Sequence, residues 1–322
     1  MTNVYRLSRR GFCLCCIGAT TMAATGGGWL SPRQSFAKAL GIVEMIRADA
    51  AKASIKTYKL RGNVAILEGS GGNMGVLTGA DGTLLVDAGI TATRPRIMGA
   101  LASLDNAPVK HLVNTHWHFD HADGNEWISR EGARIIAHAN TRKNLMAAVR
   151  VEDWNFNFPA APSAAIPTET FSGEKTVVLN KSTLLLKHHP NAHTDGDIAV
   201  TFAEANVLHA GDIYWNGIYP FIDYSTGGSI DGTIREVEAI LSDADDQTII
   251  VPGHGHPVSN KSELRDYREM LVAIRDRVSA LKRQKRTLEE IVAANPTAPF
   301  DQKWGQFVIT PAFFTKLVYE GV

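Results

Sequence analysis

A short polar segment of the chain, residues 114–125, concentrates side chains that can bind a metal. It follows the apolar run 109–113, and three imidazoles and a carboxylate fall within six residues: His116, His118, Asp120 and His121. Neutral imidazole and carboxylate are the ligands that zinc takes where no thiolate is available, and catalytic zinc sites keep one coordination position for water. The segment therefore predicts a hydrolytic metal centre. The alternative, a solvated loop that is histidine-rich by accident, is disfavoured by four ligands in this order after a buried-looking strand.

The elements around this segment decide whether its ligands can meet. If the apolar run 109–113 is a strand that ends near Thr115, the first two histidines point to the same side by the two-residue period of a strand. The aspartate and the third histidine then lie in the turn before a helix that Asp123 or Asn125 could cap. We therefore expect four metal-competent groups at one strand end.

Further metal-competent residues stand at the ends of other predicted strands. Each follows an apolar run and lies near a glycine: His193, Asp212 and His254. Asp87 ends the third strand of a predicted β-meander, residues 58–87, which contains a tight Asp-Gly turn. The chain thus offers candidate ligands at several strand ends.

Beyond the meander, the apolar pattern predicts alternating strands and helices. We expect helices at residues 94–104, 141–151, 231–241 and 262–286, and strands at 109–113, 134–137, 175–179, 183–187, 198–202, 206–209 and 248–251. Residues 154–162 combine aromatic residues with prolines and should form a long loop, which either contributes a pocket wall or is held by its own rings. Thr287 should cap a short helix and Pro311 should open a terminal one.

These motifs resemble those of the metallo-β-lactamase-fold hydrolase superfamily, whose order His-x-His-x-Asp-His, His, Asp, His is matched at every position over residues 58–256. The resemblance implies an α/β fold, namely a four-layer αββα sandwich, here with a C-terminal helical extension. It implies a first metal at one edge of the sandwich, bound by His116, His118 and His193. It implies a second metal bound by Asp120, His121 and His254, with Asp212 bridging the two metals and Asp87 as a structural support.

The chemistry implied by this resemblance is hydrolysis. Two zinc ions, with iron and manganese as further candidates, can share a water and lower its pKa from 15.7 towards ~7, which gives a metal-bound hydroxide at neutral pH. Asp120 would orient the hydroxide and relay a proton. The substrate would carry an activated carbonyl bond, as in a lactone, ester, thioester or β-lactam. The alternative is a mononuclear iron sulfur dioxygenase, or a related oxidoreductase on the same fold, which metal analysis would distinguish.

An aromatic-rich segment, residues 214–224, begins two residues after Asp212 and so must leave the metal edge. Its rings, with the two that alternate with the ligands of the first motif, could form an apolar substrate pocket: Trp117, Phe119, Trp215 and Tyr219. Such a pocket excludes water, offers few fixed charges and suits a neutral or weakly polar acyl compound. The alternative is that these rings only brace the loops.

Composition limits the partners. The chain of 322 residues is 44% hydrophobic, which is ample for a core, and its formal net charge is zero. A chain without excess positive charge has no electrostatic footprint for nucleic acid or for an anionic membrane surface. We therefore expect a small-molecule substrate and no nucleic-acid partner, and we predict no particular oligomeric state.

Residues 1–37 are typical of an export signal. Arg9 and Arg10 precede a mildly apolar stretch, and residues 35–37 form a small-x-small cleavage site that ends at Ala37. The paired arginines resemble a twin-arginine signal, so we expect a periplasmic protein without stable membrane association after cleavage, with an uncleaved anchor as the alternative. All three cysteines lie in this signal, so His, Asp or Glu must hold any metal in the mature chain. The expected division is the signal (1–37), the metallo-β-lactamase-fold domain (38–260) and a helical extension packing on that domain (261–322).

Overall fold

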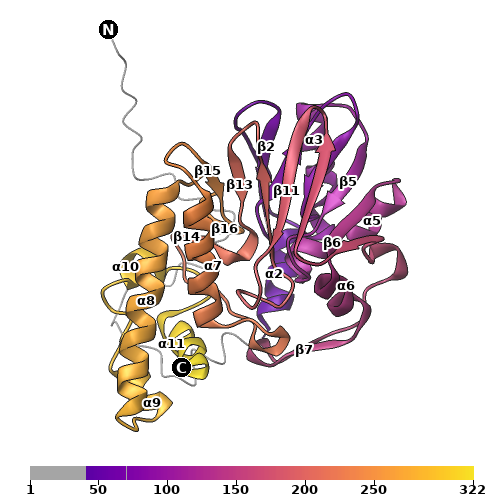
Figure 1. The fold of residues 1–322 in the computed structure, drawn as a ribbon. Coiled ribbons are helices and arrows are strands. Elements are labelled where there is room, and N and C mark those ends of the chain that lie inside the picture. Colours follow the sequence, from indigo (N-terminus) through magenta and orange to yellow (C-terminus); the bar gives the residue numbers. More distant parts are fainter. Residues whose placement is uncertain (1–40, 70) are drawn as a thin grey trace.

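Two β-sheets face each other in the computed structural model, which describes residues 41–69 and 71–322, and helices cover both outer faces (Figure 1). The first sheet contains, in spatial order, β1 (Lys56–Lys59), β2 (Val64–Glu68), β3 (Met74–Leu77), β4 (Thr83–Val86), β5 (Val109–Val113), β6 (Arg134–His138) and β9 (Glu169–Phe171). The second contains β10 (Glu174–Leu179), β11 (Ser182–His188), β12 (Ile198–Phe202), β13 (Val207–His209) and β15 (Ile249–Val251). This arrangement confirms the predicted αββα sandwich with C-terminal helices.

Two small ladders and a set of helices complete the described chain. β7 (Val149–Val151) pairs with β8 (Phe156–Phe158), and β14 (Trp215–Asn216) pairs with β16 (His254–Gly255). The α-helices are α2 (Ile42–Ala50), α3 (Arg94–Leu104), α4 (Phe119–Ala122), α5 (Asn125–Arg130), α6 (Ala139–Met146), α7 (Ile230–Asp243), α8 (Lys261–Arg283), α9 (Leu288–Ala293), α10 (Asp301–Trp304) and α11 (Pro311–Gly321). Short 3₁₀ turns are η2 (Thr91–Thr93), η3 (Glu152–Trp154), η4 (Ser163–Ala165), η5 (Gly211–Ile213) and η6 (Tyr224–Thr226).

The sheets pack together because their strands alternate between two apolar faces. In β2, Val64 and Ile66 join the core between the sheets, whereas Ala65 and Leu67 join the core beneath α3 and α5. This is the two-residue period of a strand, and it buries β2 on both sides. The first sheet is thereby fixed between a helical layer and the second sheet.

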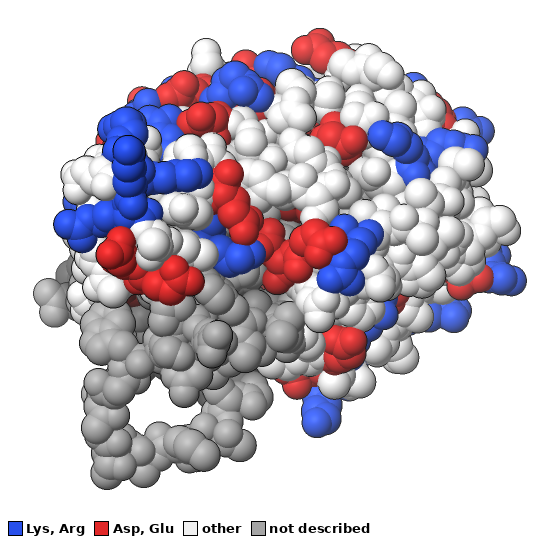
Figure 2. Space-filling model, turned by 90° about the horizontal axis from the view of Figure 1, so that it is seen from below, with Lys and Arg blue, Asp and Glu red and all other residues white. Residues whose placement is uncertain are grey.

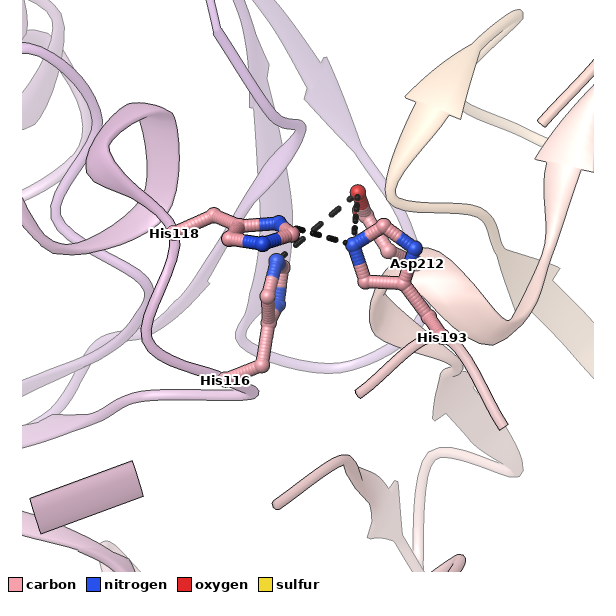
Figure 3. A group of neighbouring side chains, drawn as sticks. All are labelled: His116, His118, His193 and Asp212. Atoms are coloured by element: carbon pink, nitrogen blue, oxygen red, sulfur yellow. Dashed lines mark hydrogen bonds and ion pairs between the residues drawn. The ribbon is translucent and has the colours of Figure 1, made fainter. Parts of the chain in front are cut away.

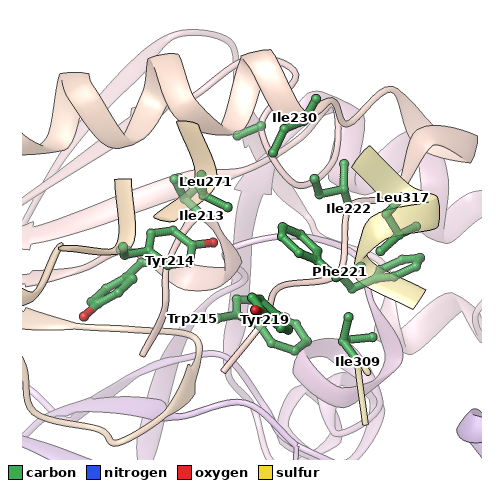
Figure 4. Close-up of a cluster of buried hydrophobic side chains, with 14 of the residues drawn as sticks. Ile213, Tyr214, Trp215, Tyr219, Phe221, Ile222, Ile230, Leu271, Ile309 and Leu317 are labelled. Carbon is green, nitrogen blue, oxygen red and sulfur yellow. The ribbon is translucent and has the colours of Figure 1, made fainter. Parts of the chain in front are cut away.

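The C-terminal helices cover the outer face of the second sheet. One large apolar cluster joins α7, α8 and α11 to this sheet and to the aromatic segment after Asp212 (Figure 4). In α8 the buried residues recur at helical spacing, namely Leu264, Tyr267, Met270, Leu271, Ile274 and Val278. The Lys- and Arg-rich helix is therefore a solvated helix with one buried stripe.

Local capping and surface charge agree with the sequence pattern. Thr287 forms a capping box with Glu290 at the start of α9, and Pro311 opens α11, as predicted. On the face shown in Figure 2, acidic and basic side chains lie side by side, as a zero net charge would suggest. Within residues 41–69 and 71–322, the helices lack the combination of length and apolar character needed to cross a bilayer.

Some predicted elements were wrong in their limits. The helix expected at 141–151 ends at Met146, and its last residues form β7 instead; the expected loop 154–162 contains β8, which pairs with β7. The pairing of β7 with β8 replaces the last part of the expected helix. The expected caps Asp123 and Asn125 are also wrong, because His118 precedes α4 and Gly124 precedes α5 without a side-chain cap. The predicted export signal, 1–37, lies outside the described residues.

Candidate metal centre

All seven predicted ligands meet at one edge of the sandwich. They form two groups, and within each group the potential ligand atoms lie within 4.8 Å of one another (Figure 3 shows the first). The first group contains His116, His118, His193 and Asp212, and the second contains Asp120, His121 and His254. β13 and β15 are parallel neighbours, so the residues that follow them, Asp212 and His254, emerge at the same edge.

Asp87 holds the loop that carries the first motif. β5 ends at Val113, so the loop beyond it, rather than a strand period, sets the direction of the histidines. The two oxygens of the Asp87 carboxylate accept hydrogen bonds from the Thr115 backbone N–H (2.7 Å), the Thr115 hydroxyl (2.7 Å) and His121 Nδ1 (2.8 Å). Asp87 is fully buried and has a left-handed backbone conformation (φ 65°). This residue therefore acts as the structural support that the sequence suggested.

Outer hydrogen-bond partners turn each imidazole so that one nitrogen faces the centre. Nδ1 is occupied in His116 by the Thr115 hydroxyl (3.0 Å), in His121 by Asp87, and in His193 by the Phe221 carbonyl (2.9 Å). His118 is turned the other way, because its Nε2 contacts Asp223 Oδ2 at 3.0 Å and its Nδ1 faces His193 Nε2. Partners of this kind fix the tautomer and orientation of a metal-binding imidazole.

The inward-facing nitrogen and oxygen atoms of the first group lie close together. His118 Nδ1 and His193 Nε2 approach to 2.9 Å, and Asp212 Oδ2 lies 3.4 Å from His193 Nε2 and 3.8 Å from His116 Nε2. His116 Nε2 is buried and has no hydrogen-bond partner among the described residues. A buried polar atom without a partner is unfavourable unless another group satisfies it. The donor set therefore fits a metal ion.

The second group adjoins the first through Asp212. Oδ1 of Asp212 lies 3.1 Å from His121 Nε2, and Oδ2 of Asp212 lies 3.2 Å from His254 Nε2. The two imidazoles of the group face each other, with Nε2 atoms 3.2 Å apart, and Asp120 Oδ2 is 3.2 Å from His254 Nε2. Imidazole nitrogens and carboxylate oxygens again converge, so this donor set also fits a metal ion.

The two groups differ in charge. Burial lowers the pKa of His116 well below its usual range and lowers that of His193 to about 4, so both are neutral near pH 7. Burial alone would lower the pKa of His254, but Asp212 and Asp120 raise it to about 9. Burial alone would raise the pKa of Asp120, but His121 and His254 lower it to about 2. His116 and His193 thus offer free imidazole lone pairs, whereas His254 shares a proton with the carboxylates beside it, which a metal ion bound by the second group would displace.

Two glycines allow the backbone to pack directly against the ligands. A Cβ atom on Gly72 would lie 2.1 Å from Cε1 of His121, and one on Gly253 would lie 2.0 Å from Oδ1 of Asp212. Side chains cannot approach so closely, so the ligands would have to move if either glycine were replaced. These two glycines therefore help to fix the positions of the ligands that pack against them.

Two of the predicted pocket residues, Trp215 and Trp117, pack against ligand imidazoles, and Phe119 packs against a neighbouring ring. The Trp215 ring is 4.3 Å from that of His254 and 6.4 Å from that of His193, measured between centroids. Trp117 lies 4.8 Å from His118, and Phe119 stacks on Phe158 at 5.7 Å. All three are buried, and their role in a substrate pocket stays a prediction.

The prediction for Tyr219 was wrong. Tyr219 is fully buried among the C-terminal elements, where its ring stacks on Phe314 at 4.7 Å (Figure 4). Its hydroxyl donates a hydrogen bond to Asp301 Oδ1 at 2.9 Å. Tyr219 is close to Asp212 in sequence, but the chain turns away from the metal centre after β14. The Tyr219 ring therefore packs in the hydrophobic core.

Asp223 is a residue of the site that the sequence did not identify. It closes the aromatic segment after Asp212, and its carboxylate contacts His118, which lies 105 residues earlier. The sequence signal is limited to a turn pattern, because Asp223 precedes Tyr224-Ser225-Thr226-Gly227 and caps η6. That pattern predicts a turn, not a histidine partner.

Known proteins share this fold. The model of the Metallo-beta-lactamase superfamily matches residues 67–279. A hydroxyacylglutathione hydrolase from Rhodospirillum rubrum is 24% identical over 232 residues, which cover 67% of this chain and 78% of the relative.

Two solved structures are similar at lower sequence identity. A sec-alkylsulfatase from Pseudomonas sp. has a TM-score of 0.62 and 17% identity, with 85% of this chain and 51% of the sulfatase covered. A metallo-beta-lactamase from Pontibacter korlensis has a TM-score of 0.56 and 18% identity, with 68% of this chain and 99% of the lactamase covered. The chain therefore spans about half the length of the sulfatase. These likenesses show a shared fold and leave the substrate open.

Proposed function

We propose that this chain, which belongs to the metallo-beta-lactamase superfamily, is a dinuclear zinc hydrolase that cleaves an activated carbonyl bond in a small molecule. The observation that carries the proposal is the meeting of five imidazoles and two carboxylates in two adjoining groups. Asp212 faces both groups, at 3.4 Å from His193 Nε2 and 3.1 Å from His121 Nε2, which suits a bridging ligand.

The side chains divide the work of hydrolysis. When bound, two zinc ions lower the pKa of water towards ~7 and polarise a carbonyl oxygen. Asp120, whose Oδ2 lies 3.2 Å from His254 Nε2, would orient the attacking water and relay its proton. Its side chain is 10% exposed, against 3% for Asp212, so Asp120 is the more accessible of the two carboxylates. Trp215 packs over His254 and limits the access of bulk water.

The lining around the centre supports an acyl substrate of low charge. The rings beside the ligands are apolar, and apolar surroundings favour neutral or weakly polar groups over a multiply anionic phosphate. No lysine occurs in residues 213–260 to bind a lactam carboxylate, so standard β-lactams should be poor substrates. The relative named for hydrolysis of hydroxyacylglutathione is consistent with an acyl substrate.

A hydrolysis panel tests this function. The full chain, loaded with zinc, is expected to hydrolyse a lactone, ester, thioester or β-lactam, with low efficiency on standard β-lactams. Trp215→Ala should lower kcat/KM without changing metal content, because it removes the ring beside His254 and no donor atom, while Trp215→Phe should retain more activity. A sec-alkyl sulfate belongs in the panel because a sulfatase shares the fold.

Three results would count against this proposal. Phosphodiester hydrolysis far above every carbonyl substrate would overturn the pocket argument. Iron as the sole metal that supports activity would favour the sulfur dioxygenase or a related oxidoreductase. Full activity in Trp215→Ala would leave that ring with a bracing role only.

We also propose export to the periplasm by the twin-arginine route, which rests on Arg9, Arg10 and the weakly apolar stretch behind them. Replacing both arginines by lysine should leave precursor in the cytoplasm, since twin-arginine signals are read as paired arginines. Cell fractionation with immunoblotting measures this. Normal periplasmic processing of the double variant would show that another route carries the chain.

A further inference from the structure

The carboxylate of Asp223 is buried, and both of its oxygens are occupied. Oδ2 contacts His118 Nε2 at 3.0 Å and accepts a hydrogen bond from the Thr226 hydroxyl at 2.6 Å. Oδ1 accepts a hydrogen bond from the Ser225 backbone N–H at 2.9 Å. A carboxylate is an acceptor at every position, so the donor in the contact with His118 is the imidazole N–H. The proton of His118 therefore resides on Nε2.

The loop around Asp223 also contacts His193 of the first group and the neighbouring Trp117. The backbone N–H of Asp223 donates to the carbonyl of His193 at 2.9 Å, and the Thr226 hydroxyl accepts from Trp117 Nε1 at 3.2 Å. Gly228 packs so closely on His193 that a Cβ atom there would lie 2.2 Å from the His193 carbonyl oxygen. One short loop, residues 223–228, thus contacts both His118 and His193, which are distant in sequence.

The orientation of His118 differs from that of the other imidazoles in the centre. His116, His121 and His193 turn Nε2 inward, whereas His118 turns Nδ1 inward. Nδ1 can bind a metal only while the ring proton stays on Nε2. We infer that Asp223 is a positioning residue that holds His118 in this tautomer and thereby sets the metal affinity of the first group. This inference rests on the proposed metal centre and names a residue that the seven-ligand motif does not contain.

The atomic arrangement predicts that asparagine cannot replace Asp223. If the asparagine oxygen took the place of Oδ2, its NH₂ group would face the N–H of Ser225, donor against donor. If it took the place of Oδ1, the NH₂ group would face His118 Nε2 and favour a proton on Nδ1, where the metal must bind. The first arrangement leaves the Ser225 N–H without an acceptor and loosens the loop that holds Asp223, and the second removes the acceptor of the His118 N–H, so the isosteric change Asp223→Asn probes the positioning role.

The test is metal affinity, measured by competition with a chromophoric zinc chelator on the full chain. Asp223→Asn should lower the affinity of one of the two sites about 10–100-fold, the usual cost of losing an outer partner of a metal-binding histidine. The absorption spectrum of the cobalt(II)-loaded protein should change as well, because the coordination of His118 is altered. Ser225→Ala is the matched control: it keeps the backbone N–H to Asp223 and removes a hydroxyl whose one recorded contact within the described part of the chain is with the Glu152 N–H.

Each outcome decides the inference. Affinity and cobalt spectrum equal to wild type in Asp223→Asn would overturn it, and so would an equal loss in Ser225→Ala, which would show a general effect of the loop. If Asp223→Asn fails to fold, Thr226→Val decides: it removes one donor to Oδ2 together with the acceptor of Trp117 Nε1, and it should lower the affinity severalfold, whereas unchanged affinity would contradict the inference. A wild type that binds metal but hydrolyses no carbonyl substrate would refute the proposed function alone.

Discussion

His116→Ala is expected to empty the first metal group and to abolish hydrolysis. His116 is fully buried, its Nε2 has no other partner among the described residues, and it lies 3.8 Å from Asp212 Oδ2. The change removes a donor atom at a fully buried position, where water cannot replace it without loss of geometry. The expected fall in kcat/KM exceeds the roughly 100-fold cost of losing an outer partner of a ligand. Elemental analysis and a hydrolysis assay measure the two effects together.

His256→Ala is the control for this prediction. His256 lies two residues from His254, but it is exposed and its Nδ1 lies 3.0 Å from the Val258 carbonyl. Metal content and activity should match wild type in this variant. If His116→Ala retained its full metal content, the assignment of His116 to the centre would be wrong.

Asp87→Ala is expected to weaken metal binding and to destabilise the fold. The change leaves the N–H groups of Thr115 and His121 buried without their acceptor. Removing one partner of a buried charged network typically costs about 3–5 kcal/mol. Because Thr115 also contacts His116, the loss should reach both metal groups. Urea unfolding with and without zinc measures the free energy of unfolding in each state.

Asp87→Asn separates the two roles of this residue. Asparagine tolerates the left-handed backbone at φ 65°, so it preserves the turn while it removes the charge and one acceptor. Its loss of stability should fall between wild type and Asp87→Ala. Equal stability of wild type and Asp87→Ala would show that the hydrogen bonds to Thr115 and His121 contribute nothing to the fold.

The sequence predicted those features that depend on residue type and local order. The four ligands between His116 and His121 were recognisable because few structural roles require three imidazoles and a carboxylate in six residues. The strand and helix alternation followed from apolar periodicity, and β5 and α3 have the predicted limits. The roles of all seven ligands in metal binding stay predictions, although their side chains meet in space.

Features set by contacts between distant segments could not be predicted. The contact of Asp223 with His118 spans 105 residues, and no local pattern encodes it. Tyr219 and Trp215 are four residues apart in one aromatic segment, yet one stacks on Phe314 and the other lies beside His254. The end of α6 at Met146 is likewise fixed by the pairing of β7 with β8, which outweighs the helical pattern.

The central claim is that two groups of ligands hold two zinc ions in one hydrolytic centre. Its most direct test is the zinc content of the full chain by elemental analysis, after loading with excess zinc and removal of unbound metal. The geometry of the two groups around Asp212 predicts two zinc ions per chain. One zinc ion per chain at saturation would contradict the dinuclear centre.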